Sequence, residues 1–424
     1  MTETLSPAAA RRVFLLLTLT RWFPVGIVGS LIILWALEQG LPISLALLAF
    51  SAQGFVTLLL ELPTSGFADA FGRRAVFLAS GVVNVVAAAV MVLADSLATF
   101  AVAAALQGVY RALDSGPLEA WYVDTLHVTE PDADPDGTLA AQGTVVGLSI
   151  AAGALLSGAL VAWNPLHLDS ALELPMWTWV VLAVIHLIAI AVLLKEPPVG
   201  TGAGWARARQ SVREAPQVVR EGIGLLARNR VLLALVLVEV FWSVGMVTFE
   251  SFMPVRLAEL VGGEERAGAL MGPVSAGGWA VFALGSALAG LTSRRLGATR
   301  TAMLARVLNG LGAVAMGLAA GPVALIVAYL VTYGLHGSAG PVHATLLHRE
   351  ATRRNRATVL SMNSMVAFAA FAVAGPLLGF LATGVSTQVA MVTAGAFSIL
   401  GVLCYLPALH AERARAQSPA PSAS

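Results

Sequence analysis

Charge is scarce in this sequence of 424 residues. Only 12% of the side chains are charged, about half of the roughly 25% that is usual in soluble domains. Hydrophobic residues make up 58% of the chain, and apolar runs recur from one end to the other. This composition excludes an ordinary soluble domain and predicts a membrane protein. The formal net charge of +1 gives no reason to expect nucleic-acid binding.

Cysteine and lysine are almost absent. Cys404 is the single cysteine, so the sequence excludes an internal disulfide and a metal site made of several cysteines. Lys195 is the single lysine and belongs to no P-loop motif, which excludes an ATP-driven pump of that type. His167 and Asp169 are near neighbours, but no G-x-S-x-G motif accompanies them. We therefore expect no enzyme activity, no cofactor and no metal ion.

Long apolar runs organise the chain. A helix that crosses a bilayer needs about 20 apolar residues, and twelve such runs lie at approximately 13–37, 42–64, 75–94, 97–121, 138–162, 175–194, 230–254, 267–291, 301–320, 322–346, 357–382 and 386–407. This pattern predicts an all-α membrane protein with twelve transmembrane helices. We expect an N-terminal six-helix bundle at 1–194, a cytoplasmic central linker at 195–229, and a C-terminal six-helix bundle with a short cytoplasmic tail at 230–424.

Basic residues are distributed unevenly among the segments that join these runs. If the N-terminus is cytoplasmic, twenty of the twenty-five Lys and Arg residues lie in cytoplasmic segments, and only Arg256 and Arg266 lie in outer loops. The remaining three lie within the apolar runs. Because basic residues stay preferentially on the cytoplasmic side, we expect a multi-pass protein of the plasma (inner) membrane with both termini in the cytoplasm.

Short motifs repeat between the two halves. SGFADAFGRR follows the second run and GLTSRRLGATR follows the eighth, and aligning Gly72 with Gly297 gives an offset of 225 (297 − 72). GALLSG in the fifth run and GPLLG in the eleventh align Gly153 with Gly375, an offset of 222 (375 − 153). Two nearly equal offsets predict a duplicated six-helix unit, an arrangement with which transporters build a site between repeats.

The segment after the second run also carries a family signature. Residues 65–74 resemble G-x-x-x-D-[RK]-x-G-[RK]-[RK], the motif between helices 2 and 3 of the major facilitator superfamily. The matching positions are Asp69, Gly72, Arg73 and Arg74, whereas Ser65 and Ala70 depart from the motif. The fifth run, GTVVGLSIAAGALLSGAL, is similar to the glycine-rich signature of drug–proton antiporters. The resemblance implies two pseudo-symmetric six-helix bundles that work by alternating access.

These charged residues predict a conformational latch. Asp69 lies where it can meet the positive N-terminal end of another helix, which the resemblance implies is the eleventh, near Ala357. Arg73, followed by Arg74, can reach an acid at the cytoplasmic end of the fourth helix, and we expect Asp124 to be that acid. Gly72 permits a sharp turn. The alternative is an anchor that only holds this loop in the cytoplasm.

Ionisable residues inside the apolar runs mark the candidate coupling site, because charges are costly in a bilayer and usually face a cavity or a partner. Arg21 and Glu239 lie at matched depth in equivalent helices and could meet near the pseudo-twofold axis. We expect Glu239 to bind the transported proton. Arg111 and Asp114 are three residues apart on one helical face. A fixed structural ion pair is the alternative in both cases.

Further candidates are neutral or weakly basic. His186 and His336 lie at mid-depth and could relay protons, although a packing role is the alternative. Gln53, Trp242 and Asn363 are candidate substrate-binding residues, with contacts between helices or with lipid as the alternative.

These features together favour a gradient-driven, proton-coupled transporter that exports a small apolar or cationic compound. One alternative is uptake of a small nutrient such as a sugar or carboxylate, with Arg21 and Arg111 binding the anion. An alternative of another class is a receptor or scaffold that transports nothing. We expect a monomer whose partners are its small-molecule substrate, protons and the lipid bilayer.

Overall fold

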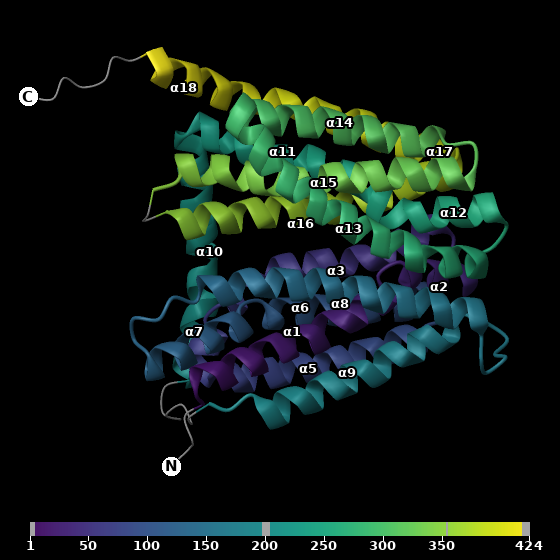
Figure 1. Ribbon diagram of the computed structural model, residues 1–424, viewed down its shortest axis with the longest axis horizontal. Helices are drawn as coiled ribbons and strands as arrows, with labels where there is room; N and C mark the ends of the chain where they lie inside the picture. The colour runs from purple at the N-terminus through teal and green to yellow at the C-terminus, as the bar shows by residue number, and fades with distance from the viewer. Residues whose placement is uncertain (1–4, 197–203, 353–354, 418–424) are drawn as a thin grey trace, which may run out of the picture. The chain divides into compact units, whose positions relative to one another are not determined.

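All regular elements of the described chain are helices. The computed structural model describes residues 5–196, 204–352 and 355–417. The first half contains α1 (Pro7–Val28), α2 (Leu31–Glu38), α3 (Ile43–Thr64), α4 (Phe67–Phe71), α5 (Arg73–Val92), α6 (Leu97–Asp114), α7 (Pro117–Thr129), α8 (Asp136–Trp163) and α9 (Glu173–Leu193). The second contains α10 (Gly204–Arg228), α11 (Arg230–Val247), the π-helical turn η1 (Thr248–Phe252), α12 (Met253–Val261), α13 (Glu264–Leu296), α14 (Ala298–Leu318), α15 (Pro322–Glu350), α16 (Arg356–Gly384), α17 (Thr387–Leu400), the 3-10 turn η2 (Gly401–Tyr405) and α18 (Leu406–Gln417). The predicted all-α class is confirmed (Figure 1).

Most of the predicted spans coincide with long apolar helices. In the described chain ten helices are long and apolar enough to cross a membrane, and an eleventh results if α1 and α2 form one bent span. The remaining predicted span, 97–121, corresponds to α6, which has 18 residues. α6 carries Gln107, Arg111 and Asp114, and these polar side chains lower its hydropathy. Backbone groups in a bilayer must bond within their own segment, which explains why each apolar run is helical.

Two spans are irregular at places that the sequence did not reveal. α1 and α2 meet at an angle of 41° around Gly29 and Ser30. Pro24 lies inside α1, which nevertheless continues through it to Val28. In the second half, α11 ends in the π-helical turn η1, and Pro254 follows at the start of α12. Since proline has no N–H for the carbonyl of residue 250, regular α-helical bonding cannot continue there.

The fourth predicted span ends earlier than expected, and the central segment contains a long helix. α6 stops at Asp114 because Gly116 adopts a positive φ of 95° and Pro117 begins α7.

The central segment was predicted only as a linker. It contains the 25-residue helix α10, many of whose charged side chains are exposed. Residues 197–203 lie outside the described part.

The chain divides into two compact units. Unit 1 comprises residues 1–216 and 254–280, and unit 2 comprises residues 217–253 and 281–424. α13 therefore contributes its first part to unit 1 and its second part to unit 2. The bundle boundaries predicted from the sequence, 1–194 and 230–424, stay a prediction.

Glycine and serine bring helices together in unit 1. α1 packs on α8 and α9, and α6 packs on α3 and α5. A Cβ atom on Gly153 of α8 would lie 2.2 Å from the carbonyl oxygen of Phe23, and one on Gly26 of α1 would lie 2.2 Å from that of Ile150. The Ser157 hydroxyl donates a 2.7 Å hydrogen bond to a carbonyl of α1. The GALLSG motif thus serves close helix packing.

Unit 2 repeats the same packing scheme. α11 packs on α16 and α17, and α14 packs on α15 and α17, as their sequence equivalents α1 and α5 do in unit 1. Gly72 before α5 has φ 91° and ψ 149°, and Gly297 before α14 has φ 83° and ψ 156°. Because side chains strongly disfavour this conformation, the shared glycine supports the predicted alignment of the two halves.

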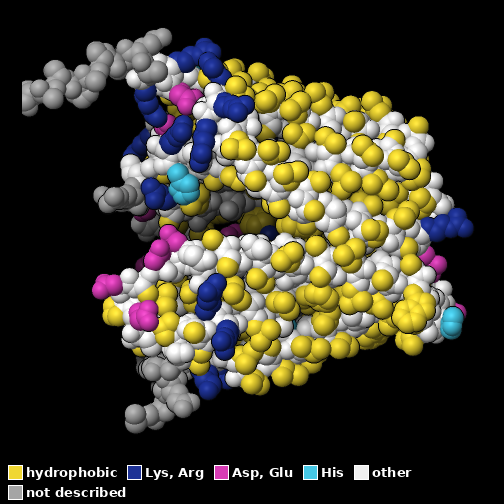
Figure 2. All heavy atoms as spheres, viewed as in Figure 1, with side chains coloured by type: hydrophobic (Ala, Val, Ile, Leu, Met, Phe, Trp, Pro, Cys, Tyr) yellow, Lys and Arg dark blue, Asp and Glu magenta, His cyan; other side chains and the backbone are white. Residues whose placement is uncertain are grey.

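Hydrophobic side chains cover the flanks of the helices in each unit, whereas basic side chains gather near helix ends (Figure 2). Leu59 of α3 and Leu93 after α5 are exposed in unit 1, and Val323 of α15 is exposed in unit 2. Apolar surface on this scale would be unfavourable in water. It suits helices that are surrounded by lipid.

Candidate functional site

A buried carboxylate lies at the centre of a polar cluster in unit 2. Glu239 of α11 is 7% exposed, and its Oε1 lies 3.2 Å from Nε2 of His343 on α15. The same oxygen accepts a 3.2 Å hydrogen bond from Nδ2 of Asn363 on α16. Asn363 Oδ1 also lies 3.2 Å from His343 Nε2, which closes a triangle of three side chains from three helices. A protonated His343 would make this contact an ion pair.

The cluster continues toward an arginine. Nδ1 of His343 lies 3.0 Å from the hydroxyl of Tyr405 in η2, and Arg306 of α14 interacts with the same hydroxyl. Arg306 is 2% exposed and lies over the ring of Trp242, with its Cζ 3.8 Å from the ring centroid. Its Nε and Nη1 have no hydrogen-bond partner among the described residues. Stacking on Trp242 therefore stabilises a cation whose donors are only partly used.

A second carboxylate lies further along the same helix. Glu250 lies in the π-helical turn η1 and interacts with the hydroxyl of Tyr333. The ring of His336 stacks on Trp242 at a centroid distance of 4.7 Å, and it lies 5.6 Å from the ring of Tyr333. His336 is thus packed among aromatic rings. Its neighbours include Trp242, over which Arg306 lies, and Tyr333, which interacts with Glu250.

Unit 1 holds a buried ion pair between different helices. Arg21 of α1 pairs with the carboxylate of Asp114 at the end of α6, and both side chains are largely buried. Arg21 Nη2 also donates a 3.5 Å hydrogen bond to the backbone carbonyl of Asp114, and the Tyr110 hydroxyl interacts with Arg21. The sequence suggested that Asp114 is neutralised by Arg111 on its own helix. The structure instead gives the ion pair to Arg21, while Arg111 interacts electrostatically with Glu61 of α3.

The other unit 1 candidates lie apart from this pair. Nδ1 of His186 on α9 lies 2.8 Å from the Thr20 hydroxyl, and its ring meets the Phe77 ring edge-on at 5.7 Å. The Gln53 side chain is half-buried and makes no hydrogen bond with a described residue. Gln107 of α6 donates a 3.3 Å hydrogen bond to Asn84 of α5. The structure therefore brings together Glu239, Asn363, Trp242 and His336 in unit 2, and Arg21 and Asp114 in unit 1.

The segment between α3 and α5 forms the contact that the sequence predicted. Nη2 of Arg73 lies 2.5 Å from the carboxylate of Asp124 on α7. Asp69 is exposed and lies 4.0 Å from the Arg73 guanidinium. Arg74 donates through its side chain to the carbonyl of Ala191, at 2.8 Å. The predicted contact of Asp69 with the eleventh helix and the latch role of these residues stay predictions.

An acid that the sequence did not single out completes this segment. The Glu196 carboxylate accepts hydrogen bonds from the backbone N–H groups of Arg73, at 3.1 Å, and Arg74, at 2.7 Å. These groups are the free donors at the start of α5, where a negative charge is favoured. Gly72, whose φ is positive, provides the turn that leads into this helix. No group of three or more His, Cys, Asp and Glu side chains able to hold a metal ion lies among the described residues.

Comparison with known families decides the classification. The model of the Major Facilitator Superfamily matches residues 14–344 and again residues 268–424. The chain belongs to the major facilitator superfamily. Membership makes it a transporter rather than an enzyme, and the predicted fold is confirmed. The resemblance to drug–proton antiporters in particular receives no support from these matches.

Solved structures share the fold at low sequence identity. The nucleoside transporter NupG has a TM-score of 0.77 and 9% identity over 94% of this chain and 99% of that chain. A peptide transporter, POT, in complex with sulfate has a TM-score of 0.73 and 15% identity over 96% of this chain and 95% of that chain. The tetrameric transporter PepTSo2 has a TM-score of 0.70 and 13% identity over 97% of this chain and 100% of that chain. No curated protein matches the chain significantly.

Proposed function

We propose that the chain is a proton-coupled secondary transporter and that Glu239 and His343 form its proton-binding centre. The observation that carries this proposal is the buried contact of 3.2 Å between their side chains, which Asn363 bridges. One added proton changes the charge of this contact, and in a bilayer interior a charge change is costly unless neighbouring groups rearrange. Three helices meet at the contact, so protonation can favour one conformation over another.

Transport of protons with substrate in proteoliposomes tests this proposal. Purified protein is first screened with small molecules by thermal shift, and the compounds that bind are then offered under an imposed pH gradient. We expect proton movement with substrate in the wild type, and loss of pH dependence in Glu239→Gln. Glu221→Gln, which changes an exposed acid of α10, is the matched control. Unchanged coupling in Glu239→Gln would remove this residue from the mechanism.

Export of a small apolar or cationic compound is our first proposal for the transported substrate. Two carboxylate oxygens inside unit 1, Oδ1 of Asp114 and Oε2 of Glu61, have no hydrogen-bond partner among the described residues. Such oxygens attract a cation when they are accessible to one. Proton-driven export predicts that the compound accumulates on the proton-rich side of the membrane.

Uptake of a small nutrient with a carboxylate is the second proposal, and Arg306 favours it. Its Nε and Nη1 donors are buried without a partner among the described residues, and a guanidinium N–H can donate a charge-assisted hydrogen bond to a carboxylate. Uptake predicts accumulation on the side opposite the proton-rich one. The nucleoside and peptide transporters that share the fold do not favour uptake over export, because at this identity the likeness concerns the fold alone. Absence of any flux would favour the receptor or scaffold alternative.

The basic residues and the contact between Arg73 and Asp124 support proposals about membrane orientation and conformational switching. We propose that the protein is a monomer in the plasma membrane. Both of its termini lie in the cytoplasm, because twenty of the twenty-five basic residues then face the cytoplasm. The contact between Arg73 and Asp124 supports a latch that is made in one conformation and broken in another. Asp69, Gly72 and Arg74 belong to the same segment and would move with it.

A further inference from the structure

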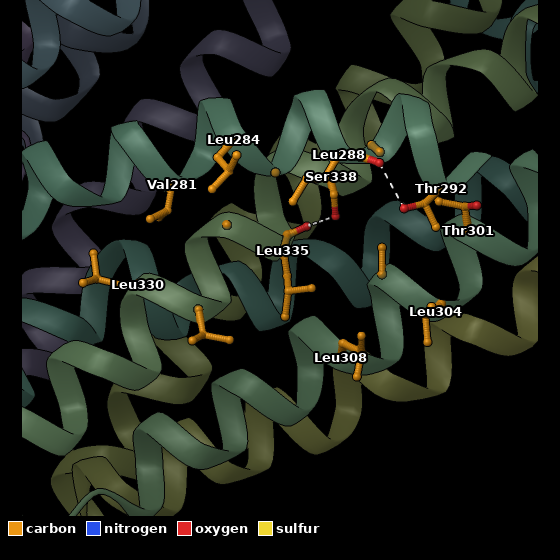
Figure 3. A pocket seen from close by; sticks show the side chains of 15 residues that line it. Val281, Leu284, Leu288, Thr292, Thr301, Leu304, Leu308, Leu330, Leu335 and Ser338 are labelled. Carbon is orange, nitrogen blue, oxygen red and sulfur yellow. Dashed lines mark hydrogen bonds between the residues drawn. The ribbon is translucent and has the colours of Figure 1, made fainter. Parts of the chain in front are cut away.

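An apolar groove lies on the flank of unit 2. It is formed by the second part of α13 together with α14 and α15, and it has a volume of about 460 Å³ (Figure 3). Leu284 and Leu288 of α13, Leu304 and Leu308 of α14, and Val331 of α15 line it, and each of these side chains is more than a third exposed. The groove therefore opens to the surroundings of the helices, which in a membrane protein are lipid chains.

The few polar atoms of the groove are already used. The hydroxyl of Ser338 donates to the carbonyl of Leu335 at 2.7 Å, and that of Thr292 donates to the carbonyl of Leu288 at 3.0 Å (Figure 3). The hydroxyl of Thr301 donates to a backbone carbonyl at 2.9 Å. Each bond stays within one turn of helix, so the walls offer an occupant hydrocarbon contacts rather than hydrogen bonds.

The chain segment beyond one end of this groove carries three arginines. Thr292 and Thr301 mark that end in Figure 3, and the chain between them carries Arg294, Arg295 and Arg300, all of them exposed. None of the three forms an ion pair with a described residue. Glu412 approaches Gly297, but its carboxylate pairs with Arg349 at 3.3 Å.

The equivalent segment of the first half, by contrast, has acidic partners within the chain. There the arginine after the shared glycine turn pairs with Asp124, and Glu196 accepts hydrogen bonds from the start of α5. The second copy keeps the turn but has Arg294 where the first has Asp69, and Ala298 and Thr299 where the first has Arg73 and Arg74. Its basic residues are therefore placed differently, at Arg294, Arg295 and Arg300. No acidic side chain of the described residues therefore pairs with these three arginines, and their positive charge can attract an anionic group.

We infer that this groove binds an anionic phospholipid. An acyl chain occupies the space between α13, α14 and α15, and the phosphate lies against Arg294, Arg295 and Arg300. The distribution of basic residues places this end at the cytoplasmic leaflet, where anionic lipids concentrate and basic pockets between helices recognise their head groups. The apolar walls favour an acyl chain, and the arginines favour a negatively charged head group.

Lipid retention by the purified full-length protein tests this inference. Protein extracted in mild detergent is incubated with phosphatidylglycerol or phosphatidylcholine of identical chains, and bound lipid is counted by native mass spectrometry. We expect retention of phosphatidylglycerol to exceed that of phosphatidylcholine. The triple variant Arg294→Gln, Arg295→Gln and Arg300→Gln should weaken phosphatidylglycerol retention by about tenfold or more, because each basic residue near an anionic headgroup contributes substantially.

A control triple variant removes the same charge elsewhere. Arg209→Gln, Arg213→Gln and Arg220→Gln alter exposed residues of α10 and should leave retention unchanged. Phosphatidylglycerol with a photoreactive acyl chain should label peptides from 284–308 and 330–338 in preference to other lipid-facing helices. Equal losses in the two triple variants, or labelling spread evenly over the apolar surface, would overturn the inference.

Discussion

The strongest interaction of two buried charged residues in unit 1 is an ion pair between helices. Arg21 pairs with Asp114, and both side chains are largely buried. Removing one member of such a pair leaves an uncompensated charge in a low-dielectric interior, whereas replacing both by apolar residues removes the problem. The pair therefore offers a test of whether its role is structural.

We expect Asp114→Asn to lower the free energy of unfolding by about 3–5 kcal/mol, because Arg21 stays charged without its partner. Thermal unfolding in detergent measures the change. The double variant Arg21→Met with Asp114→Leu should recover most of the lost stability. If the double variant recovers stability but transports nothing, the pair acts in transport as well as in folding. If it is as unstable as the single variant, the ion pair is not the source of the loss.

The sequence identified charged residues inside the spans but could not assign their partners. Helical spacing places Arg111 and Asp114 on one face, yet the carboxylate turns to an arginine of α1 instead. Spacing within a helix carries no information about the neighbouring helix. Tyr405 and Tyr333 were missed for a similar reason, since a tyrosine in an apolar run gives no sign of whether its hydroxyl meets a histidine or a carboxylate.

At the scale of helices, close backbone approach sets the packing of α1 on α8. Gly153→Val should lower the free energy of unfolding by about 1–3 kcal/mol or more, because its Cβ would overlap the carbonyl oxygen of Phe23 at 2.2 Å. Gly147→Val on the same helix is the control, as no atom lies within 4 Å of its added Cβ. Thermal unfolding of both variants measures the two losses of stability. Equal losses would show that the lower helix propensity of valine, rather than packing against α1, causes the destabilisation.

Helices were easier to predict than their interruptions. Length and hydropathy place a span within a few residues, because a bilayer demands about 20 apolar residues in a row. The bend after α1 occurs at Gly29 rather than at Pro24, since a proline inside a membrane helix can be accommodated by its surroundings. The break before α7 needed the conformation of Gly116, which hydropathy cannot supply.

For the whole molecule, the orientation in the membrane is open to chemical labelling. Cys404 is the only cysteine, so Cys404→Ser gives a background free of thiols. Ser65→Cys, at the exposed end of α3, should react with a membrane-impermeant maleimide only after the cytoplasmic side is opened. Asp169→Cys, in the exposed loop before α9, should react in intact cells. The opposite pattern would invert the proposed topology.

The duplication was the most reliable prediction at this scale. Two short motifs set the offset between the halves, and the matching backbone of Gly72 and Gly297 agrees with it. Substrate and direction of transport were beyond reach, because they depend on which side chains face a common space in each conformation. Such placement follows from packing between helices rather than from the order of residues.

Cys404 also gives the chain a built-in spectroscopic reporter. It is partly buried in η2, directly before the tyrosine whose hydroxyl lies 3.0 Å from His343. A small fluorinated tag on this thiol would sit one residue from Tyr405, which contacts His343 of the proposed proton-binding centre. Its magnetic resonance frequency as a function of pH would then record the titration of that centre in the intact protein, without any engineered cysteine.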